Sequence, residues 1–382
     1  MRQDSIGTTD PLVALFIELA RIPSPFGHER SVVDFITTRL RGLGLEVWEG
    51  DPLYDNSKSS AGNLYCRIPG DTDGVTILLS AHTDTVASDP DAYPDPWLDG
   101  NVIRSRSRSV LGADDKAALA AILYAVEKIV REQLPHAGIE LLLTVGEEGG
   151  LLGAKASSLE KLESRCGFCF DSTGPVGDVI VKSPSQKTVN ALFMGRSAHA
   201  GVVPEAGRNA IAAAGKAIAG MRLGRIDEET TANVGIIRGG DAVNVVPDRC
   251  SINGEARSHD NEKLEAQVAA MVDSINLAAS QEDVDVEITI VDEFTGFDFS
   301  EGGGLPVELA ERAIRRIGLT PGYASTGGGS DVNVFNLMGL PCVNLATGME
   351  KVHTPDESIT VESLYHMHEM ILALVEEAQK EL

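Results

Sequence analysis

Three uninterrupted apolar runs constrain the fold of this chain more than any other feature. They are "VTILLSAH" (75–82), "GIELLLTV" (138–145) and "CGFCFD" (166–171), and a helical pattern separates the first two. A strand that is apolar on both faces is typical of a parallel sheet covered by helices. Because strands alternate with helices here, we predict an α/β fold with a mostly parallel sheet and helices on both faces.

The pattern of elements changes between residues 183 and 296. A strand pattern ("KTVNALFMGRSAHA"), a helix, two strand patterns, a second helix and a last strand ("DVEITIV") follow one another there. This βαββαβ order is typical of a ferredoxin-like sheet with two helices on one face. A chain of 382 residues is long enough for two cores. We therefore predict an α/β domain of residues 1–182 and 297–382, interrupted by an inserted domain of residues 183–296.

The composition excludes several classes of partner. Acidic residues number 57 against 32 basic ones, which gives a formal net charge of −25. Such a charge repels nucleic acid and anionic membrane surfaces, and no apolar run approaches the length of a membrane-spanning helix. We expect no nucleic acid and no membrane partner. The first residues lack the apolar stretch of a signal peptide and cysteine is sparse, so we expect a cytoplasmic protein.

Ionisable residues gather where the predicted strands end. The set consists of His82, Asp84, Asp114, Glu147, Glu148, Asp171 and His353. In an open parallel sheet the carboxyl ends of the strands form the ligand crevice, so these side chains meet at one edge. Carboxylates buried together need a partner, because an unpaired buried charge is costly. A mixed imidazole and carboxylate set without thiolate suits zinc, and also cobalt or manganese.

The spacing within two pairs of these residues indicates which roles their side chains can have. His82 and Asp84 are two residues apart, so in an extended chain they point to the same side, where one can bind metal and the other can hold the imidazole. Glu147 and Glu148 are adjacent and must point in different directions. One of them can bind metal while the other takes a proton from an attacking water.

Two short motifs allow more than one interpretation. Asp114 and Asp115 precede an apolar helix pattern, where an aspartate commonly acts as a helix N-cap or complements the helix dipole. Cys166 and Cys169 form a C-x-x-C that suits a redox pair or half of a zinc site. Their apolar surroundings favour a buried strand instead.

Eight motifs occur in an order that resembles a known family. They are "SAHTDTV", "LGADDKAA", "TVGEEGGLLGA", "FDSTGP", "GRSAHAG", "GGDAVNVVP", "STGGGSDVNVF" and "KVHTPDE". Together they resemble the M20 family of di-metal peptidases and amidohydrolases, and "LGADDKA" and "GGGSD" resemble its tripeptidase T branch. The resemblance covers nearly the whole chain. It implies a catalytic α/β domain interrupted by a βαββαβ lid, which agrees with the domains predicted above.

The resemblance assigns two divalent metal ions, most often zinc, to the strand-end residues. It implies that His82 and Asp171 bind one ion, that Glu148 and His353 bind the other, and that Asp114 bridges both. The same resemblance implies a cis peptide bond between Asp114 and Asp115. Asp115 then takes the helix-entrance role.

The resemblance also assigns catalytic and substrate-binding roles. Glu147 matches the general base that activates a metal-bridging water, and Asp84 matches the residue that orients His82. His199 matches a lid histidine that stabilises the oxyanion, in dimeric relatives within the neighbouring subunit's site. Asn244 and Arg257 match residues that grip the carboxylate end of the substrate. Gly328 and Gly329 match a turn that presents backbone N–H groups to it.

The resemblance implies hydrolysis of peptide bonds in short peptides, with release of the N-terminal residue of tripeptides, by a homodimer formed through the lid. An amidohydrolase that removes acyl groups from amino acids would use the same metal motifs, so this alternative stays open. A non-catalytic binding protein of the same fold would have lost a ligand or the base. All six positions are intact in this sequence.

Overall fold

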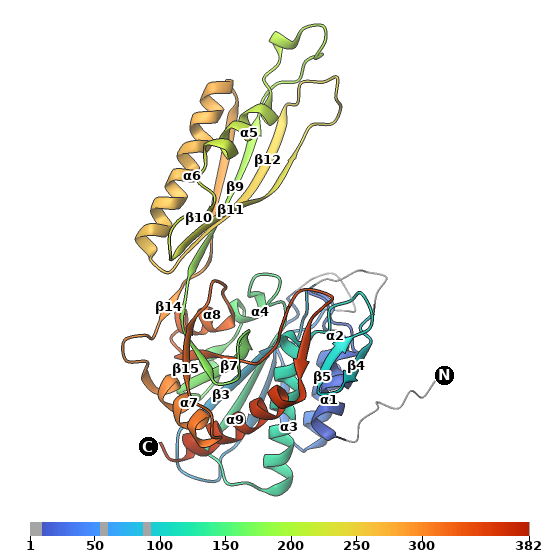
Figure 1. The fold of residues 1–382 in the computed structure, drawn as a ribbon, viewed down its shortest axis with the longest axis vertical. Helices are drawn as coiled ribbons and strands as arrows, with labels where there is room; N and C mark the ends of the chain where they lie inside the picture. Colours follow the sequence, from blue (N-terminus) through green and yellow to red (C-terminus); the bar gives the residue numbers. More distant parts are fainter. Residues whose placement is uncertain (1–9, 54–59, 87–92, 382) are drawn as a thin grey trace, which may run out of the picture. The chain divides into compact units, whose positions relative to one another are not determined.

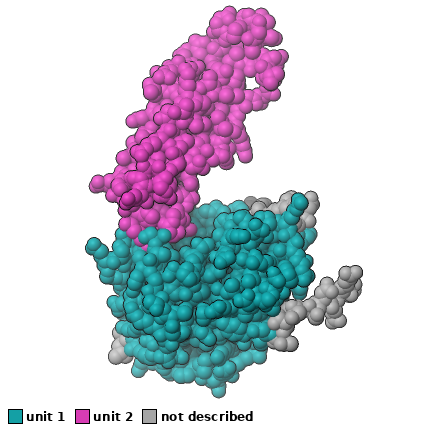
Figure 2. All heavy atoms as spheres, in the orientation of Figure 1, with its two compact units in different colours: residues 1–181, 298–325, 330–382 teal, residues 182–297, 326–329 magenta. Residues whose placement is uncertain are grey.

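The protein is described by a computed structural model that covers residues 10–53, 60–86 and 93–381. Two compact units divide the chain (Figure 2). Unit 1 contains the described residues of 1–181, 298–325 and 330–382, and unit 2 contains residues 182–297 and 326–329. Each unit has its own hydrophobic core. Residues 326–329 group with the inserted unit although they lie in the returning segment.

The large sheet of unit 1 has a parallel centre and antiparallel margins (Figure 1). Its strands run in the order β1 (Glu46–Glu49), β2 (Leu64–Ile68), β6 (Ile139–Thr144), β3 (Ile77–His82), β7 (Cys166–Ser172), β16 (Cys342–Ala346), β8 (Asp178–Ser183) and β14 (Phe297–Asp298), and β15 (Gly322–Ser325) pairs with β8. Strands β6, β3, β7 and β16 pair in parallel. Strands β1, β2 and β8 pair antiparallel. The predicted mostly parallel α/β fold is confirmed, and the antiparallel margins are additional to it.

Helices pack on this sheet against side chains that alternate along its strands. Helix α9 (Val361–Gln379) contacts α1 (Pro11–Ala20), α3 (Ala113–Glu132) and α7 (Gly304–Arg316), and α1 also contacts α3. They share one core with Ile77, Leu79 and Ala81 of β3, which point to one face because successive side chains alternate. Helix α2 (Arg30–Gly42) joins α3 through an ion pair of Arg39 with Glu127, and the short α4 (Leu152–Lys155) and α8 (Asp331–Leu337) contact each other. Among the described residues, no helix is both long and apolar enough to span a bilayer.

Unit 1 also contains a small sheet that the sequence pattern does not predict. It consists of β17 (Ser358–Thr360), β5 (Val102–Ser105) and β4 (Pro96–Asp99). Strands of three or four residues are too short to produce a clear period-2 pattern. The sheet nevertheless matters for the site, because β17 directly follows the segment that contains His353 and Glu357.

Unit 2 has the predicted βαββαβ arrangement. Its sheet runs in the order β10 (Gly224–Arg225), β11 (Thr230–Gly239), β12 (Arg249–Ser258), β9 (Ser185–Met194) and β13 (Asp285–Phe294), and its helices are α5 (Ala210–Gly220) and α6 (Asn261–Glu282). The four long strands pair antiparallel, and both helices contact the sheet. The prediction that the first strand continues to Ala200 is wrong. Gly195 leaves the sheet and packs against Arg208, where a Cβ would lie 2.0 Å from the carbonyl oxygen.

The C-x-x-C cysteines belong to the core of unit 1. Cys166 and Cys169 both lie in β7, and all five cysteines of the chain are buried and free of disulfides. Burial raises the pKa of the Cys166 thiol to about 12, which keeps it protonated and unreactive. The interpretation as a buried strand therefore agrees with the structure.

Candidate metal centre

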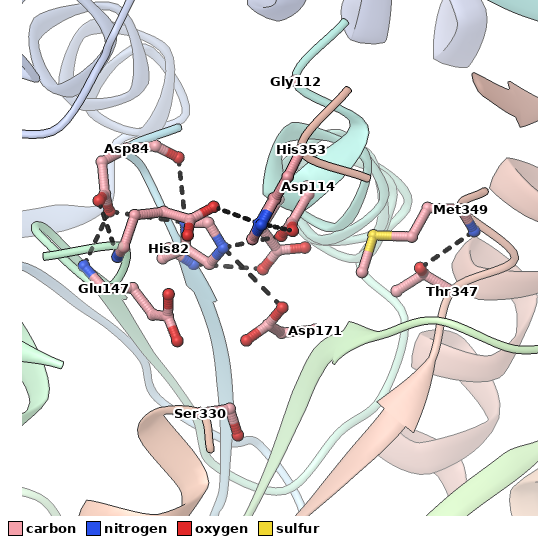
Figure 3. A network of polar contacts seen from close by, with 12 residues as sticks. His82, Asp84, Gly112, Asp114, Glu147, Asp171, Ser330, Thr347, Met349 and His353 are labelled. Carbon is pink, nitrogen blue, oxygen red and sulfur yellow. Dashed lines mark hydrogen bonds and ion pairs between the residues drawn. The ribbon is translucent and has the colours of Figure 1, made fainter. Parts of the chain in front are cut away.

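The carboxyl ends of the central strands bring together imidazole and carboxylate groups in unit 1 (Figure 3). His82 is the last residue of β3, and its Nε2 lies 2.9 Å from Asp114 Oδ1 and 3.9 Å from Asp171 Oδ1. His353 follows β16, and its Nε2 lies 3.1 Å from Asp114 Oδ2 and 2.9 Å from Glu148 Oε1. The structure thus gathers all five residues that the sequence predicts as metal ligands.

Asp114 lies at the centre of this group. Its carboxylate directs Oδ1 toward His82 and Oδ2 toward His353, and the residue is only 8% exposed. One ligand atom each of His82, Asp114 and Glu148 lie within 4.8 Å of one another. A carboxylate with one oxygen directed to each of two positions is suited to sharing two cations.

The hydrogen bonds of His82 define which nitrogen faces these carboxylates. Nδ1 lies 3.0 Å from the backbone carbonyl of Asp84, and a carbonyl oxygen can only accept, so Nδ1 carries a hydrogen. Nε2 therefore faces the oxygens of Asp114 and Asp171, and only a proton or a cation makes that contact favourable. Imidazole nitrogen and carboxylate oxygens are the donor set of zinc, cobalt and manganese sites.

A second observation supports the fit to a cation. Glu148 Oε1 is buried and forms no hydrogen bond, although His353 Nε2 lies near it. A carboxylate oxygen left in this way loses its hydration without compensation. A divalent ion bound between the two groups would supply the missing partner, so the residues present fit the metal that the sequence predicts.

The electrostatics of the site reflect its excess of carboxylates. Burial raises the pKa of Asp171 well above its usual range, and the charge of Asp114 adds to the rise. Burial and the charge of Asp171 raise the pKa of Glu147 in the same way. The neighbouring carboxylates of Asp114 and Glu148 raise the pKa of His353 to about 10. Each shift indicates a site that is deficient in positive charge.

Asp84 fixes the turn that presents the two glutamates. Its Oδ1 accepts the backbone N–H of Glu147 at 3.0 Å, and its Oδ2 accepts that of Glu148 at 3.1 Å. The carboxylate Oδ1 lies 3.5 Å from His82 Nδ1, farther than the Asp84 carbonyl. Asp84 therefore holds His82 through its backbone and holds the Glu147–Glu148 turn through its side chain.

Asp115 does not have the helix-entrance role expected for it. Gly112, at φ 75°, occupies the N-cap position of α3, and the N–H groups of Gly112 and Asp114 donate to the Glu357 carboxylate at 2.7 and 3.0 Å. Asp115 Oδ2 instead accepts the backbone N–H of His82 at 3.2 Å. The Asp114–Asp115 peptide bond is cis, as the family resemblance implies.

Two residues of the site, Glu357 and Asn344, were not predicted from the sequence. Glu357 lies inside the motif "KVHTPDE", but its contact with Gly112 joins residues 245 positions apart and has no local signature. Asn344 is the one amide in the apolar run "PCVNLATG", and its side chain bonds the backbone of Asp171. A polar residue inside a buried strand was the available signal, since buried polar groups require partners.

The predicted residues of unit 2 fall into two separate groups. His199 and Asn244 lie together and are exposed, and the N–H of Ala200 donates to the Asn244 carbonyl at 3.0 Å. Arg257 lies toward the other end of β12, where it pairs with Glu255 and donates to the Gly327 carbonyl at 3.2 Å.

Gly328 and Gly329 belong with the second group. Ser183 Oγ donates to the Gly328 carbonyl at 3.1 Å, and a Cβ on Gly329 would lie 2.4 Å from the Phe294 ring. At ~3.3 Å per residue, the strand from Arg249 to Arg257 separates the two groups by roughly 26 Å. Within one copy of unit 2, Asn244 and Arg257 therefore lie in different groups.

Comparison with known proteins identifies the family of the chain. The family model of the M20 peptidase dimerisation domain matches residues 185–283. The model of peptidase family M28 matches residues 63–224. The uncharacterised protein YqjE of Bacillus subtilis (strain 168) is 41% identical over 369 residues, which cover 97% of this chain and 98% of that protein. The chain belongs to the M20 peptidase family. Its two units correspond to the catalytic domain and the inserted lid of that family.

Two solved structures place this M20 peptidase beside the tripeptidase T branch. The aminopeptidase PepT from Bacillus cereus ATCC 10987 is 42% identical with a TM-score of 0.84, over 98% of this chain and 99% of that one. A tripeptidase from Staphylococcus aureus subsp. aureus Mu50 is 36% identical with a TM-score of 0.89, over 97% and 98% of the two chains. The protein is therefore an enzyme, a metal-dependent exopeptidase of the tripeptidase T-like type.

Proposed function

We propose that the enzyme hydrolyses peptide bonds in short peptides and releases the N-terminal residue of tripeptides. The observation that carries the proposal is the Asp114 carboxylate, which directs one oxygen to each of two imidazoles. The Glu147 carboxylate lies beside this group (Figure 3). The names of the similar aminopeptidase and tripeptidase support the choice of substrate. The donor set supports a hydrolytic metal site.

In this proposal two divalent ions occupy the site, with zinc as the first candidate and cobalt or manganese as the others. His82, Asp114 and Asp171 would hold one ion, and Asp114, Glu148 and His353 would hold the other. Such ions polarise the scissile carbonyl and lower the pKa of water when they are bound. Asp114 then has a role that no other carboxylate of the site can replace, because it serves both ions.

Glu147 acts in the proposal as the general base. Its carboxylate accepts the proton of the attacking water and then delivers that proton to the nitrogen of the leaving amine. The bond of its N–H to Asp84 supports the assignment, because it fixes the direction of the side chain next to the predicted ligands. Burial raises the pKa of Glu147, which makes it a better proton acceptor than an ordinary carboxylate.

We further propose a homodimer formed through unit 2. In such a dimer His199 reaches the partner's site and stabilises the oxyanion, while Asn244 and Arg257 of different chains meet at one substrate. Arg257 lies near the end of β12, whereas Asn244 lies in the loop before its start, and this separation supports an arrangement in which each site uses both chains. Gly328 and Gly329 would present backbone groups to the same substrate.

Mixing of two inactive variants tests the dimer. His199→Ala and Glu147→Gln chains, dissociated and reassociated together, should regain roughly a quarter of wild-type activity, because half of the dimers then contain one complete site. Light scattering gives the oligomeric state in parallel. A monomer, or a mixture no more active than its parents, would exclude an active site shared between chains.

A substrate panel tests the activity itself. Metal-reconstituted enzyme is incubated with dipeptides, tripeptides and N-acyl amino acids, and mass spectrometry identifies the product. The proposal predicts a free N-terminal residue and a dipeptide from each cleaved tripeptide. Cleavage of the N-acyl amino acids alone would identify an amidohydrolase instead.

The cellular setting belongs to the proposal as well. We place the enzyme in the cytoplasm, without nucleic acid or membrane partners. The five free cysteines suit a reducing compartment, and the net charge of −25 disfavours polyanionic surfaces. Fractionation of the cells that make the protein would test this placement.

A further inference from the structure

A bulge in strand β7 determines where Asp171 lies. Strands β16 and β7 pair in register at Asn344 with Cys169 and again at Ala346 with Ser172. Between these pairs β16 advances two residues and β7 advances three, so β7 contains one extra residue at Phe170–Asp171. Such a β-bulge interrupts the ladder and redirects a side chain, and bulges are frequent next to active sites.

The side chain of Asn344 replaces the interrupted ladder. Its Oδ1 accepts the backbone N–H of Asp171 at 2.8 Å, and its Nδ2 donates to the Asp171 carbonyl at 2.6 Å. The same Nδ2 donates to Ser330 Oγ at 3.2 Å. A backbone N–H needs an acceptor and a carbonyl needs a donor, so only one orientation of the amide satisfies both.

We propose that Asn344 is a positioning residue that directs the Asp171 carboxylate toward the cation site beside His82. The inference rests on the proposed function, in which Asp171 is a metal ligand. Asn344 is only 4% exposed, so no water replaces the amide if it is removed. The N–H and carbonyl of Asp171 would then lack partners inside the bulge, and the backbone would move to find new ones. The carboxylate that this backbone carries would move with it.

Asn336 of α8 provides a matched control, because it bonds the backbone of β16. Its Oδ1 accepts the N–H of Cys342 at 2.9 Å, and its Nδ2 donates to the Cys342 carbonyl at 2.9 Å. This amide therefore makes the same two backbone bonds at the start of β16. Cys342 is not a predicted ligand, so loss of the Asn336 clamp affects stability without affecting the direction of Asp171.

The experiment compares Asn344→Leu and Asn344→Ser with Asn336→Leu. Metal-free protein is titrated with Zn²⁺ by calorimetry, and Co²⁺ loading is followed by visible absorption, which reports ligand geometry at each ion. We expect one of the two ions to bind about 10–100-fold more weakly in both Asn344 variants, as for other residues that orient a metal ligand. The other ion should bind as in wild type, and Asn336→Leu should bind both normally. The serine variant keeps the test valid if the leucine variant does not fold.

Asp171→Asn separates this inference from the proposed function. If Asp171→Asn loses one ion while both Asn344 variants bind two ions with wild-type affinity, the positioning role is excluded and the ligand assignment stands. If Asp171→Asn still binds two ions normally, the ligand assignment itself is wrong, and the role of Asn344 is overturned with it. Equal weakening in the Asn344 and Asn336 variants would also overturn the proposal, because it would show a general effect of stability.

Discussion

The two units hold their predicted functional residues in opposite ways. In unit 1 buried polar side chains bond the backbone of several key residues, as Asp115 bonds His82 and Glu357 bonds Asp114. In unit 2 His199 and Asn244 are exposed on loops, and backbone contacts link their segments. Unit 1 is therefore preorganised to bind cations within one chain. The loops of unit 2 that contain His199 and Asn244 are held to each other by backbone hydrogen bonds at the surface.

The largest expected effect is that of Glu147→Gln. Removal of the general base should lower kcat by about 10²–10⁴-fold, because the amide cannot accept the proton of water. The metal content, measured by mass spectrometry of the purified protein, should stay at the wild-type value, since Glu147 is not a predicted ligand. Unchanged turnover of a tripeptide would show that another group is the base.

His199→Ala tests the role of an exposed residue of unit 2. If His199 is the proposed oxyanion donor, its loss should lower kcat by about 10²–10³-fold. Because the side chain is exposed, the free energy of unfolding should change by less than about 0.5 kcal/mol, as measured by urea titration. A large loss of stability would mean that His199 is a structural residue of its loop.

The strand-end ligands were predictable from sequence, whereas the residues that hold them were not. His82, Glu148 and Asp171 follow apolar runs, and the order of elements places such strand ends at one edge. Asp115, Glu357 and Asn344 act through bonds from side chain to backbone across the fold, which leave no periodic trace in the sequence. The antiparallel margins of the sheet were missed for a related reason, since an apolar run does not indicate strand direction.

Asp84→Asn tests how far preorganisation depends on one carboxylate. Asparagine has one acceptor oxygen, so one N–H of Glu147 or Glu148 loses its partner. We expect a loss of about 1–3 kcal/mol in the free energy of unfolding, and calorimetry should show metal binding weakened by about 10–100-fold.

Asp227→Asn in unit 2 is the control for this change. The Asp227 carboxylate also accepts two backbone N–H groups, those of Glu229 and Thr230, but at an exposed turn. Both bonds use Oδ1, which asparagine keeps, and water reaches the exposed side chain. We therefore expect a change within about 0.5 kcal/mol and unchanged metal binding. Equal changes in stability and metal binding in Asp84→Asn and Asp227→Asn would show that the buried carboxylate of unit 1 matters no more than the exposed carboxylate of unit 2.

Among the predicted site residues, Arg257→Ala should have the smallest effect. Its ion pair with Glu255 is partly exposed, so its removal should cost at most about 1 kcal/mol of unfolding free energy. If Arg257 contacts the carboxylate end of the peptide, KM for tripeptides should rise while kcat changes little. Steady-state kinetics with a tripeptide and its C-terminal amide provide the check. Identical kinetics of wild type and variant on both substrates would limit Arg257 to its contacts with Glu255 and Gly327.

The most direct test of the account is to locate the metal ions themselves. Crystals of cobalt- or zinc-loaded enzyme should give two anomalous peaks per chain at the ends of β3 and β7. One peak should lie beside Asp114 Oδ1 and His82, and the other beside Asp114 Oδ2 and His353. A single peak, or two peaks that do not share Asp114, would contradict the central claim.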